Sequence, residues 1–345
     1  QPKHARGIRA RITGVGAVSS LHARLAELTG PITEGLVEMR AVIAGHLSDS
    51  SPAVSDMTDH IARFQGKQLR GSLVMLVGRA HGVYTDEHPT VAAVVEMIHL
   101  ATLVHDDVLD GAEVRRRVAC VNERWDNQVA VLLGDFLYAR AFGLSTELSS
   151  RLCSRLLSET TRQLCVGEIE QSTMRYDFEV SQVVYERIAA AKTGTLYSAA
   201  CELGARYPGG DDSRGQAMRA FGNELGLAFQ IIDDCLDVLG EEHLVGKSVG
   251  NDVNDGKVTL PILRTYSQAD EGTRGLIRDA YTLPGIEDRR GRLREVCDLQ
   301  PGAEYALARA EQLVAKAMGR LDGLEDSAAK RALKQMGEFV LQRNF

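Results

Sequence analysis

The sequence predicts an all-α protein, and three observations favour this class. Proline breaks helix interiors, and none of the 8 prolines lies between Pro89 and Pro208. Strand signals are poor, because apolar and polar residues do not alternate regularly and no Asn-Gly hairpin joins β-branched runs. Residues 304–324 and 327–342 interleave charged and apolar side chains at helical spacing.

The expected elements follow in chain order. Apolar runs predict helices over residues 91–110, 127–144, 149–174 and 193–207. Segments rich in turn-forming or charged residues predict loops over residues 83–89, 111–119, 207–215 and 240–256. No low-complexity linker divides the chain, so we expect residues 25–345 to form a single all-α domain.

Composition excludes several classes of protein. Apolar residues make up 44% and charged residues 25% of the 345 residues, as in an ordinary globular protein, and the net charge of -7 argues against nucleic-acid binding. Six cysteines without CxxC pairing indicate free thiols in a reducing compartment, so a cytoplasmic location is expected. No apolar run reaches membrane-spanning length. Residues 1–24 are basic and lack acidic residues, which predicts a flexible tail or, alternatively, a transit peptide.

Two acidic clusters carry most of the chemical information. Each has the pattern Asp-Asp-x-x-Asp at the end of an apolar run, and their members are Asp106, Asp107, Asp110, Asp233, Asp234 and Asp237. On a helix, positions i and i+4 share a face and i+3 lies beside them, so each cluster points its carboxylates in nearly one direction. Crowded carboxylates repel one another unless a cation neutralises them. Mg²⁺ prefers oxygen ligands, and it is typically bound by one or two carboxylates together with substrate phosphates. Two clusters facing across a cavity would therefore hold a diphosphate.

Basic residues accompany both clusters. They are Lys67 and Arg70, the run Arg115, Arg116 and Arg117, Lys192 beside Thr193, Lys247 and Lys257 on a glycine-punctuated loop, and His99 two turns before Asp106. Arginine binds phosphate bidentately and lysine acts as a mobile point charge. Each feature alone has an ordinary explanation, such as a solvated charge run or a core histidine. The phosphate-loop pattern of nucleotide hydrolases is absent. The combination indicates a diphosphate site.

These motifs resemble the trans-prenyltransferases, the all-α isoprenyl diphosphate synthases of the polyprenyl synthetase family. GKQLR, EMIH, DDVLD, GDFLYARAF, KTGTL, FQIIDDCLD, GKSVGND and GKVTLP occur in the family's order over residues 66–261. The chain is most similar to the medium- and long-chain enzymes. The resemblance implies the isoprenoid synthase fold, a bundle of about ten or more helices around a deep central cavity. It also implies a homodimer.

The resemblance assigns roles to individual residues. Lys67, Arg70, His99 and Arg116 would hold the diphosphate of isopentenyl diphosphate. The allylic diphosphate would be held by Arg115, Lys192, Thr193, Gln230, Lys247 and Lys257. The six aspartates would bridge to it through Mg²⁺, about three ions in all, with Asp233 the nearest ligand on the second side. Together with the aspartates, Lys192 and Lys257 would carry catalysis. Gly71, Arg117 and the stretch Val118-Ala119-Cys120 depart from the family pattern.

The reaction implied is ionisation, condensation and elimination. Mg²⁺ and the lysines would stabilise the departing diphosphate, the alkene of isopentenyl diphosphate would attack the allylic cation, and a proton would be lost. Ala101 and Thr102 are small where short-chain members commonly carry an aromatic residue, so we expect a product of about six to ten isoprene units, several helical turns deep. Val94, Met97, Ile98 and Phe136 are candidates for the cavity floor.

Alternatives stay open at this point. One alternative is that the small residues before the first cluster only allow close packing of helices. The chain would then be a short-chain farnesyl or geranylgeranyl diphosphate synthase. A class I terpene cyclase shares the bundle but normally lacks the second Asp-Asp-x-x-Asp. A non-catalytic partner subunit of a prenyl synthase typically loses one cluster. A long product would be nearly insoluble, which makes transient membrane contact at release a further expectation.

Overall fold

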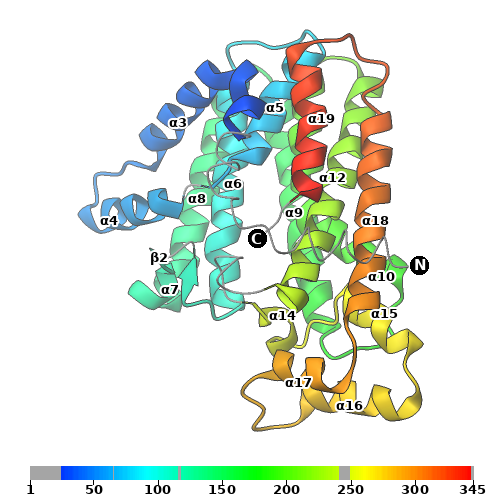
Figure 1. Cartoon of the computed structure of the whole chain (residues 1–345). Coiled ribbons are helices and arrows are strands. Elements are labelled where there is room, and N and C mark those ends of the chain that lie inside the picture. The colour runs from blue at the N-terminus through cyan, green and yellow to red at the C-terminus, as the bar shows by residue number, and fades with distance from the viewer. Residues whose placement is uncertain (1–24, 65, 116–117, 241–248, 343–345) are drawn as a thin grey trace.

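The computed structural model describes residues 25–64, 66–115, 118–240 and 249–342, and these are almost wholly helical (Figure 1). The longer helices are α3 (Thr33–Leu47), α4 (Pro52–Ile61), α5 (Leu69–Ala80), α6 (His88–Leu109), α8 (Asn127–Glu147), α9 (Leu152–Thr173), α10 (Gln182–Ala189), α11 (Thr195–Arg206), α12 (Asp212–Leu239), α15 (Leu260–Gln268), α16 (Glu271–Thr282), α17 (Arg289–Val296), α18 (Gln300–Gly319) and α19 (Ala328–Leu341). The shorter elements are η1 (Gly30–Ile32), η2 (Ala62–Phe64), α7 (Val121–Arg124), the π-helical turn η3 (Ala190–Gly194) and α14 (Asn251–Asn254).

The sheet content of the described residues is one small hairpin. Strand β1 (Val114–Arg115) pairs antiparallel with β2 (Val118–Ala119) inside the loop expected at 111–119. The predicted all-α class is therefore confirmed.

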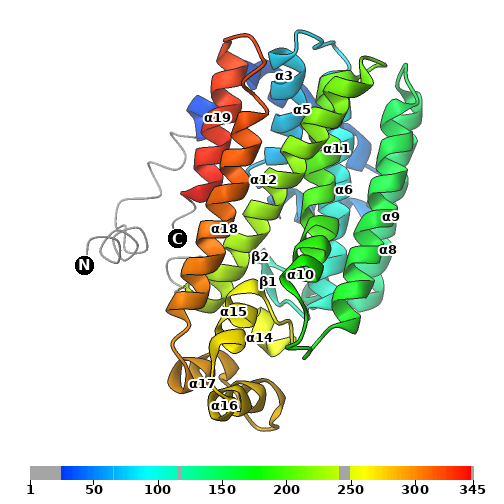
Figure 2. The ribbon, with the colours of Figure 1, turned by 90° about the vertical axis from the view of Figure 1, so that its right-hand side faces the viewer.

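The long helices run side by side around α12. This helix packs against α11 and α18, while α6 packs against α5 and α8 (Figure 2). Close approach of α11 and α12 depends on glycine, because a β-carbon at Gly222 would lie 2.3 Å from the Tyr197 carbonyl oxygen. The main cluster of buried apolar side chains extends from Leu28 to Val340, which places the core along the whole length of these helices.

A second, smaller apolar cluster lies beside α14 to α17, at one end of the molecule (Figure 1). Phe178 is at its centre, with ring centroids 4.9 Å from Tyr266 and 5.1 Å from Tyr281. The Tyr281 hydroxyl donates to the Lys257 carbonyl oxygen at 3.2 Å. This aromatic cluster therefore supports the loop that carries Lys257.

Several boundaries differ from the expected ones. Helix α12 begins inside the loop expected at 207–215, because Asp211 caps it by accepting a hydrogen bond from the Ser213 amide. The loop expected at 240–256 contains the short helix α14. The first two residues of the helix expected over 193–207 belong to the π-helical turn η3, and α11 begins at Thr195. Residues 1–24, Arg116, Arg117 and Lys247 lie outside the described residues.

Helix α8 is long and apolar enough to cross a membrane by length and composition, which inspection of the sequence missed. A core helix of a globular protein passes the same test, and α8 packs closely against α6.

Candidate active site

The first aspartate cluster lies at the carboxyl end of α6, and its three carboxylates have different surroundings. Asp107 is fully buried and accepts from Arg115, at 2.7 Å from Nε and 2.6 Å from Nη2. Asp106 and Asp110 are half-buried. Burial, reinforced by the charges of Glu168 and Asp110 and opposed by Lys192, raises the pKa of Asp106 to about 6. The raised pKa indicates that nearby positive charges do not offset the burial of Asp106 and its negative neighbours.

The second cluster, near the carboxyl end of α12, is equally uneven. Buried Asp234 accepts hydrogen bonds from the Tyr185 hydroxyl at 2.5 Å and from Gln230 Nε2 at 2.7 Å. Burial and the charge of Asp252 raise its pKa. Asp233 is half-buried.

Asp237 has a structural partner of its own. Its carboxylate accepts from three successive backbone amides, those of Gly250, Asn251 and Asp252, at 3.0, 3.2 and 3.1 Å. These amides form the start of α14, where unpaired N–H groups attract negative charge. Asp237 therefore fixes the loop after α12 instead of facing the site freely.

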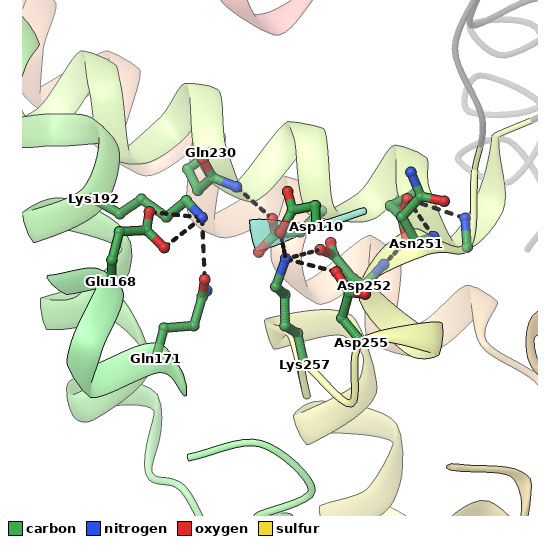
Figure 3. A network of polar contacts seen from close by, with 12 residues as sticks. Asp110, Glu168, Gln171, Lys192, Gln230, Asn251, Asp252, Asp255 and Lys257 are labelled. Carbon is green, nitrogen blue, oxygen red and sulfur yellow. Dashed lines mark hydrogen bonds and ion pairs between the residues drawn. The ribbon is translucent and has the colours of Figure 1, made fainter. Parts of the chain in front are cut away.

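Two lysines, the buried Lys257 and the half-buried Lys192, lie at the site (Figure 3). Lys257 Nζ lies 2.8 Å from Asp110 Oδ1, 2.9 Å from Asp255 Oδ2 and 3.8 Å from Asp252 Oδ1. Burial alone would lower the pKa of Lys257, but Asp252 and Asp110 raise it well above its ordinary value. The side chain is therefore a fixed positive charge between the first cluster and the loop after the second.

Lys192 comes from the π-helical turn η3 and is held from α9. Its Nζ lies 2.8 Å from Glu168 Oε1 and 3.2 Å from Gln171 Oε1 (Figure 3). Burial would lower its pKa, yet Asp106 and Glu168 raise it. Glycine at 167 lets α9 approach this turn, because a β-carbon there would lie 2.8 Å from Ala191 Cβ.

Thr193 and Gln230 form a short relay beside Lys192. The Thr193 hydroxyl donates to Gln230 Oε1 at 2.6 Å, and Gln230 Nε2 donates to Asp234. Both side chains are thereby oriented, and the second cluster is tied to the turn that carries Lys192.

Of the residues expected to hold isopentenyl diphosphate, Lys67 lies just before α5, Arg70 lies on α5 and His99 lies on α6. Lys67 Nζ is 4.9 Å above the Phe339 ring of α19, and the Arg70 guanidinium is 4.5 Å above the Tyr197 ring of α11. Arg70 Nε is buried without a hydrogen-bond partner in the described part of the chain. His99 is half-buried on α6.

The residues expected to set product length line up along α6. Ala101, Val94, Met97 and Ile98 are fully buried. Thr102 is half-buried, and its hydroxyl donates to the His99 carbonyl oxygen at 2.7 Å.

Phe136 is also half-buried, on the neighbouring helix α8. The Arg140 guanidinium lies 5.1 Å above its ring.

Departures from the family pattern have local explanations. Gly71 donates its amide hydrogen to Glu96 Oε1 at 2.7 Å, which a proline could not do. Cys120 is fully buried after β2, where burial and the nearby Asp107 raise the pKa of its thiol to about 12. Its thiol is therefore neutral near neutral pH.

Sequence reasoning missed the residues that hold the two lysines, which are Glu168, Gln171, Asp252 and Asp255. It also missed Tyr185, which binds Asp234. The acidic pair just before Lys257 could have been found in Asn-Asp-x-x-Asp-Gly-Lys, and Glu168 and Gln171 share an i, i+3 spacing on α9. Tyr185 had no comparable signal, because its contact with Asp234 joins distant parts of the chain.

Among the described residues, no three carboxylate, histidine or cysteine side chains converge closely enough to hold a metal ion alone. A bound Mg²⁺ would therefore need waters or phosphate oxygens as further ligands. The oxygen-only donors and the raised pKa of Asp106 fit such an ion.

An all-α bundle with two aspartate clusters and the lysines Lys192 and Lys257 at one site defines a class of diphosphate-binding proteins. The chain matches the family model described as polyprenyl synthetase over residues 51–299, and it belongs to that family. The predicted family is confirmed.

Relatives share most of the chain. The octaprenyl diphosphate synthase of Escherichia coli (strain K12) is 32% identical over 326 residues, covering 93% of this chain and 98% of that protein. A polyprenyl synthase from Caulobacter crescentus CB15, solved with calcium and isoprenyl diphosphate, is 31% identical with a TM-score of 0.88 and covers 93% of this chain and 98% of its own. A decaprenyl diphosphate synthase from Rhodobacter capsulatus is 31% identical with a TM-score of 0.86, covering 92% and 99%.

Proposed function

We propose that this protein elongates an allylic diphosphate with isopentenyl diphosphate to a medium- or long-chain all-trans polyprenyl diphosphate, releasing diphosphate. The observation that carries the proposal is the contact of Lys257 with Asp110, which joins the loop after the second cluster to the first. Relatives named octaprenyl and nonaprenyl diphosphate synthase support it.

Asp106, Asp110 and Asp233 are the proposed ligands of Mg²⁺, because they are the half-buried members of the two clusters. Bound Mg²⁺ would neutralise charge on the allylic diphosphate as it leaves. The other three aspartates position this set, since Asp107 pairs with Arg115, Asp234 with Tyr185, and Asp237 caps α14. The expected count of about three ions stays a prediction.

The two lysines would supply fixed positive charge to the leaving diphosphate, which is electrostatic stabilisation by preorganised groups. Thr193 and Gln230 would present oxygen dipoles to the allylic cation without a strong nucleophile. Lys67, Arg70 and His99, with Arg116, would hold the diphosphate of isopentenyl diphosphate. Arg115 would act chiefly by orienting Asp107, because two of its nitrogens already bind that carboxylate.

The test is turnover by the isolated protein with farnesyl diphosphate, isopentenyl diphosphate and Mg²⁺, followed by product-length measurement. We expect products of about six to ten isoprene units, since small side chains precede the first cluster on α6. A sole product of about four isoprene units or fewer would contradict the length assignment, because it would be shorter than the part of α6 that precedes the first cluster. Chelation of the metal should abolish turnover, and turnover with the allylic substrate alone would indicate a cyclase.

We also propose a homodimer through the outer face of α8 and α9. Leu132 on α8 is 59% exposed and Ile169 on α9 is 64% exposed, with Val131 and Val166 beside them in sequence also exposed. Apolar side chains gathered on neighbouring helices favour a partner surface. Leu132→Glu with Ile169→Glu should yield a monomer in light scattering, whereas Leu276→Glu on α16 should not. Cytoplasmic location and transient membrane contact stay predictions.

A second candidate function is a subunit that works with a partner chain. One relative is named heptaprenyl diphosphate synthase component 2, from Bacillus subtilis (strain 168), at 33% identity over 85% of this chain and 84% of that protein. Retention of both aspartate clusters favours activity in this chain. Absence of turnover by the pure protein, restored by a co-purified second chain, would favour the subunit.

A further inference from the structure

We propose that a surface cavity at the far end of the bundle from the aspartate clusters binds a phosphate group. The cavity has a volume of about 560 Å³ and lies between the start of α9 and the turn after α11. Helix α11 leads from the turn carrying Lys192 to Arg206, a distance of about 20 Å at 1.5 Å per residue. The cavity is therefore separate from the site described above.

Every charged side chain that lines the cavity is an arginine: Arg151, Arg155 and Arg206. In the part of the chain that the structure describes, Arg151 and Arg155 have no carboxylate within ion-pair distance. Arg206 Nη1 binds Glu202 at 2.9 Å and its Nη2 binds Asp212, but its Nε is buried without a partner. The guanidinium groups available to a ligand are therefore those of Arg151 and Arg155, which are exposed, and guanidinium binds phosphate bidentately.

Other groups at the cavity favour an anion. The Ser150 hydroxyl accepts from the Leu152 amide and keeps its own hydrogen to donate. The amides that follow Leu152 begin a helix of 22 residues, whose dipole adds positive potential. The cavity exceeds the size of one phosphate ion, so the ligand class is a phosphoester or a diphosphate. A soluble metabolite and a lipid headgroup share this chemistry.

The test is equilibrium dialysis of the full chain with labelled inorganic diphosphate in EDTA, which suppresses metal-dependent binding at the aspartates. Arg151→Gln with Arg155→Gln should weaken binding by at least about tenfold, because two charge-assisted contacts are lost. Arg162→Gln, on the same helix but outside the cavity, should leave it unchanged. The proposal would be overturned if the double variant bound diphosphate as well as the unaltered protein does. It would also be overturned if the protein showed no saturable binding of either diphosphate or anionic vesicles.

Vesicles distinguish the source of the phosphate. Sedimentation with phosphatidylglycerol vesicles, compared with phosphatidylcholine vesicles, tests a lipid headgroup. Arginine-dependent binding to the anionic vesicles, with no binding of free diphosphate, would assign the cavity to lipid. Arginine-dependent binding of free diphosphate alone would assign it to a soluble ligand.

A different observation carries a second inference, which rests on the proposed function: Tyr176 positions Lys257. The Tyr176 amide donates to the Gly256 carbonyl oxygen at 2.7 Å, and a β-carbon at Gly256 would lie 2.4 Å from the Tyr176 ring. Tyr176 has φ +62°, a left-handed conformation that is unfavourable for an aromatic residue. The contact with Gly256 therefore holds Tyr176 in place, next to the residue that precedes Lys257.

This contact gives the end of α9 a single role. Glu168 and Gln171 hold Lys192 from its last turns, and Tyr176 just beyond holds the backbone of the Lys257 loop. One segment thereby sets the positions of both lysines.

Tyr176→Phe keeps the ring, whereas Tyr176→Asn tolerates the left-handed backbone but removes it. We expect Phe to retain kcat within about twofold and Asn to lose at least about tenfold in kcat with KM little changed, because the lysine is misplaced. Wild-type turnover tests the proposed function separately. Amide exchange of residues 249–257 gives a readout without turnover: it should quicken in Tyr176→Asn and not in Tyr176→Phe. Equal exchange and equal kcat in both variants would overturn the inference.

Discussion

Lys257 Nζ lies 2.8 Å from Asp110 Oδ1, although the two residues are 147 positions apart in the chain. The lysine is 9% exposed and also contacts Asp255. One ammonium group therefore neutralises a carboxylate of the first cluster and a carboxylate of the loop after the second. This contact fixes how far apart the first cluster and the glycine-rich loop can lie.

Replacement of Lys257 should disable the site without unfolding the protein. We expect Lys257→Met to lower kcat by about 10² to 10³, the usual effect of removing one preorganised electrostatic group. The measurement is diphosphate release at saturating Mg²⁺ and substrates. Lys316→Met, at an exposed lysine on α18, is the control. Equal kcat for both variants would contradict the assigned role.

Restoring the family's usual proline at Gly71 should destabilise this chain. Gly71→Pro removes the hydrogen bond to Glu96 and puts atoms where a β-carbon would already lie 2.6 Å from Met39 Sδ. We expect a loss of about 1–3 kcal/mol in the free energy of unfolding, the cost of an unmade buried hydrogen bond. Urea unfolding measures it, and the control is Gly71→Ala, which keeps the amide hydrogen that proline lacks. A gain in stability would show that Met39 and Glu96 readjust freely.

His105 and Gly134 should behave as a coupled pair. A β-carbon at Gly134 would lie 2.1 Å from His105 Nε2, and that imidazole precedes Asp106 directly. We expect Gly134→Ala to cost about 1–3 kcal/mol of stability through overpacking. His105→Ala should recover most of this loss in the double variant. Simple additivity of the two changes would rule out the steric explanation.

A bulky residue at Ala101 should shorten the product. Ala101 is fully buried on α6 about one turn before the first cluster. Ala101→Phe should shift the product to fewer isoprene units, read by chromatography of the released alcohols. Ala92→Phe adds the same volume on the same helix beside α5 and should not shift length. Unchanged length in Ala101→Phe would mean that the product runs elsewhere.

The contribution of the Glu186–Arg309 ion pair to the free energy of unfolding should be lost at low pH. Both guanidinium contacts measure 2.8 Å, and the hydrogen bond to Arg309, aided by Gln182 and opposed by burial, lowers the pKa of Glu186 below 4.5. Because the folded pKa is depressed, this stabilisation is complete above about pH 4.5 and is lost as the pH falls through the lowered value. Glu186→Gln should therefore cost about 1–3 kcal/mol at pH 7 and progressively less below pH 4. A cost that is independent of pH in urea unfolding would contradict this.

Sequence motifs singled out Lys192 and Lys257, and the structure places both beside the first aspartate cluster. Sequence reasoning could not predict which of the six aspartates are bound to other protein groups and which can face the site. Asp107 and Asp234 are withdrawn from the site by Arg115 and Tyr185, and those pairings depend on how separate segments pack. Helical spacing shows which carboxylates share a face but gives no information on the partner that each one finds.

The same limit applies to the fold. Long helices such as α6 and α8 were predictable from apolar runs and the absence of proline. The hairpin β1–β2 and the helix α14 were not, because short elements are stabilised by tertiary contacts, as α14 is by Asp237. The π-helical turn η3 gives no local signal at all.

That turn has a consequence for the chain's tolerance of change. A π-helical turn holds about one residue more than an α-helical turn, and each residue of an α-helix advances the side chains by about 100°. Deleting one residue from Ala190–Gly194 would leave the apolar pattern of α11 intact while rotating Lys192 out of phase with it. Chain length in this segment is therefore constrained as strictly as any side chain, and an alignment gap there would be a sign of altered chemistry.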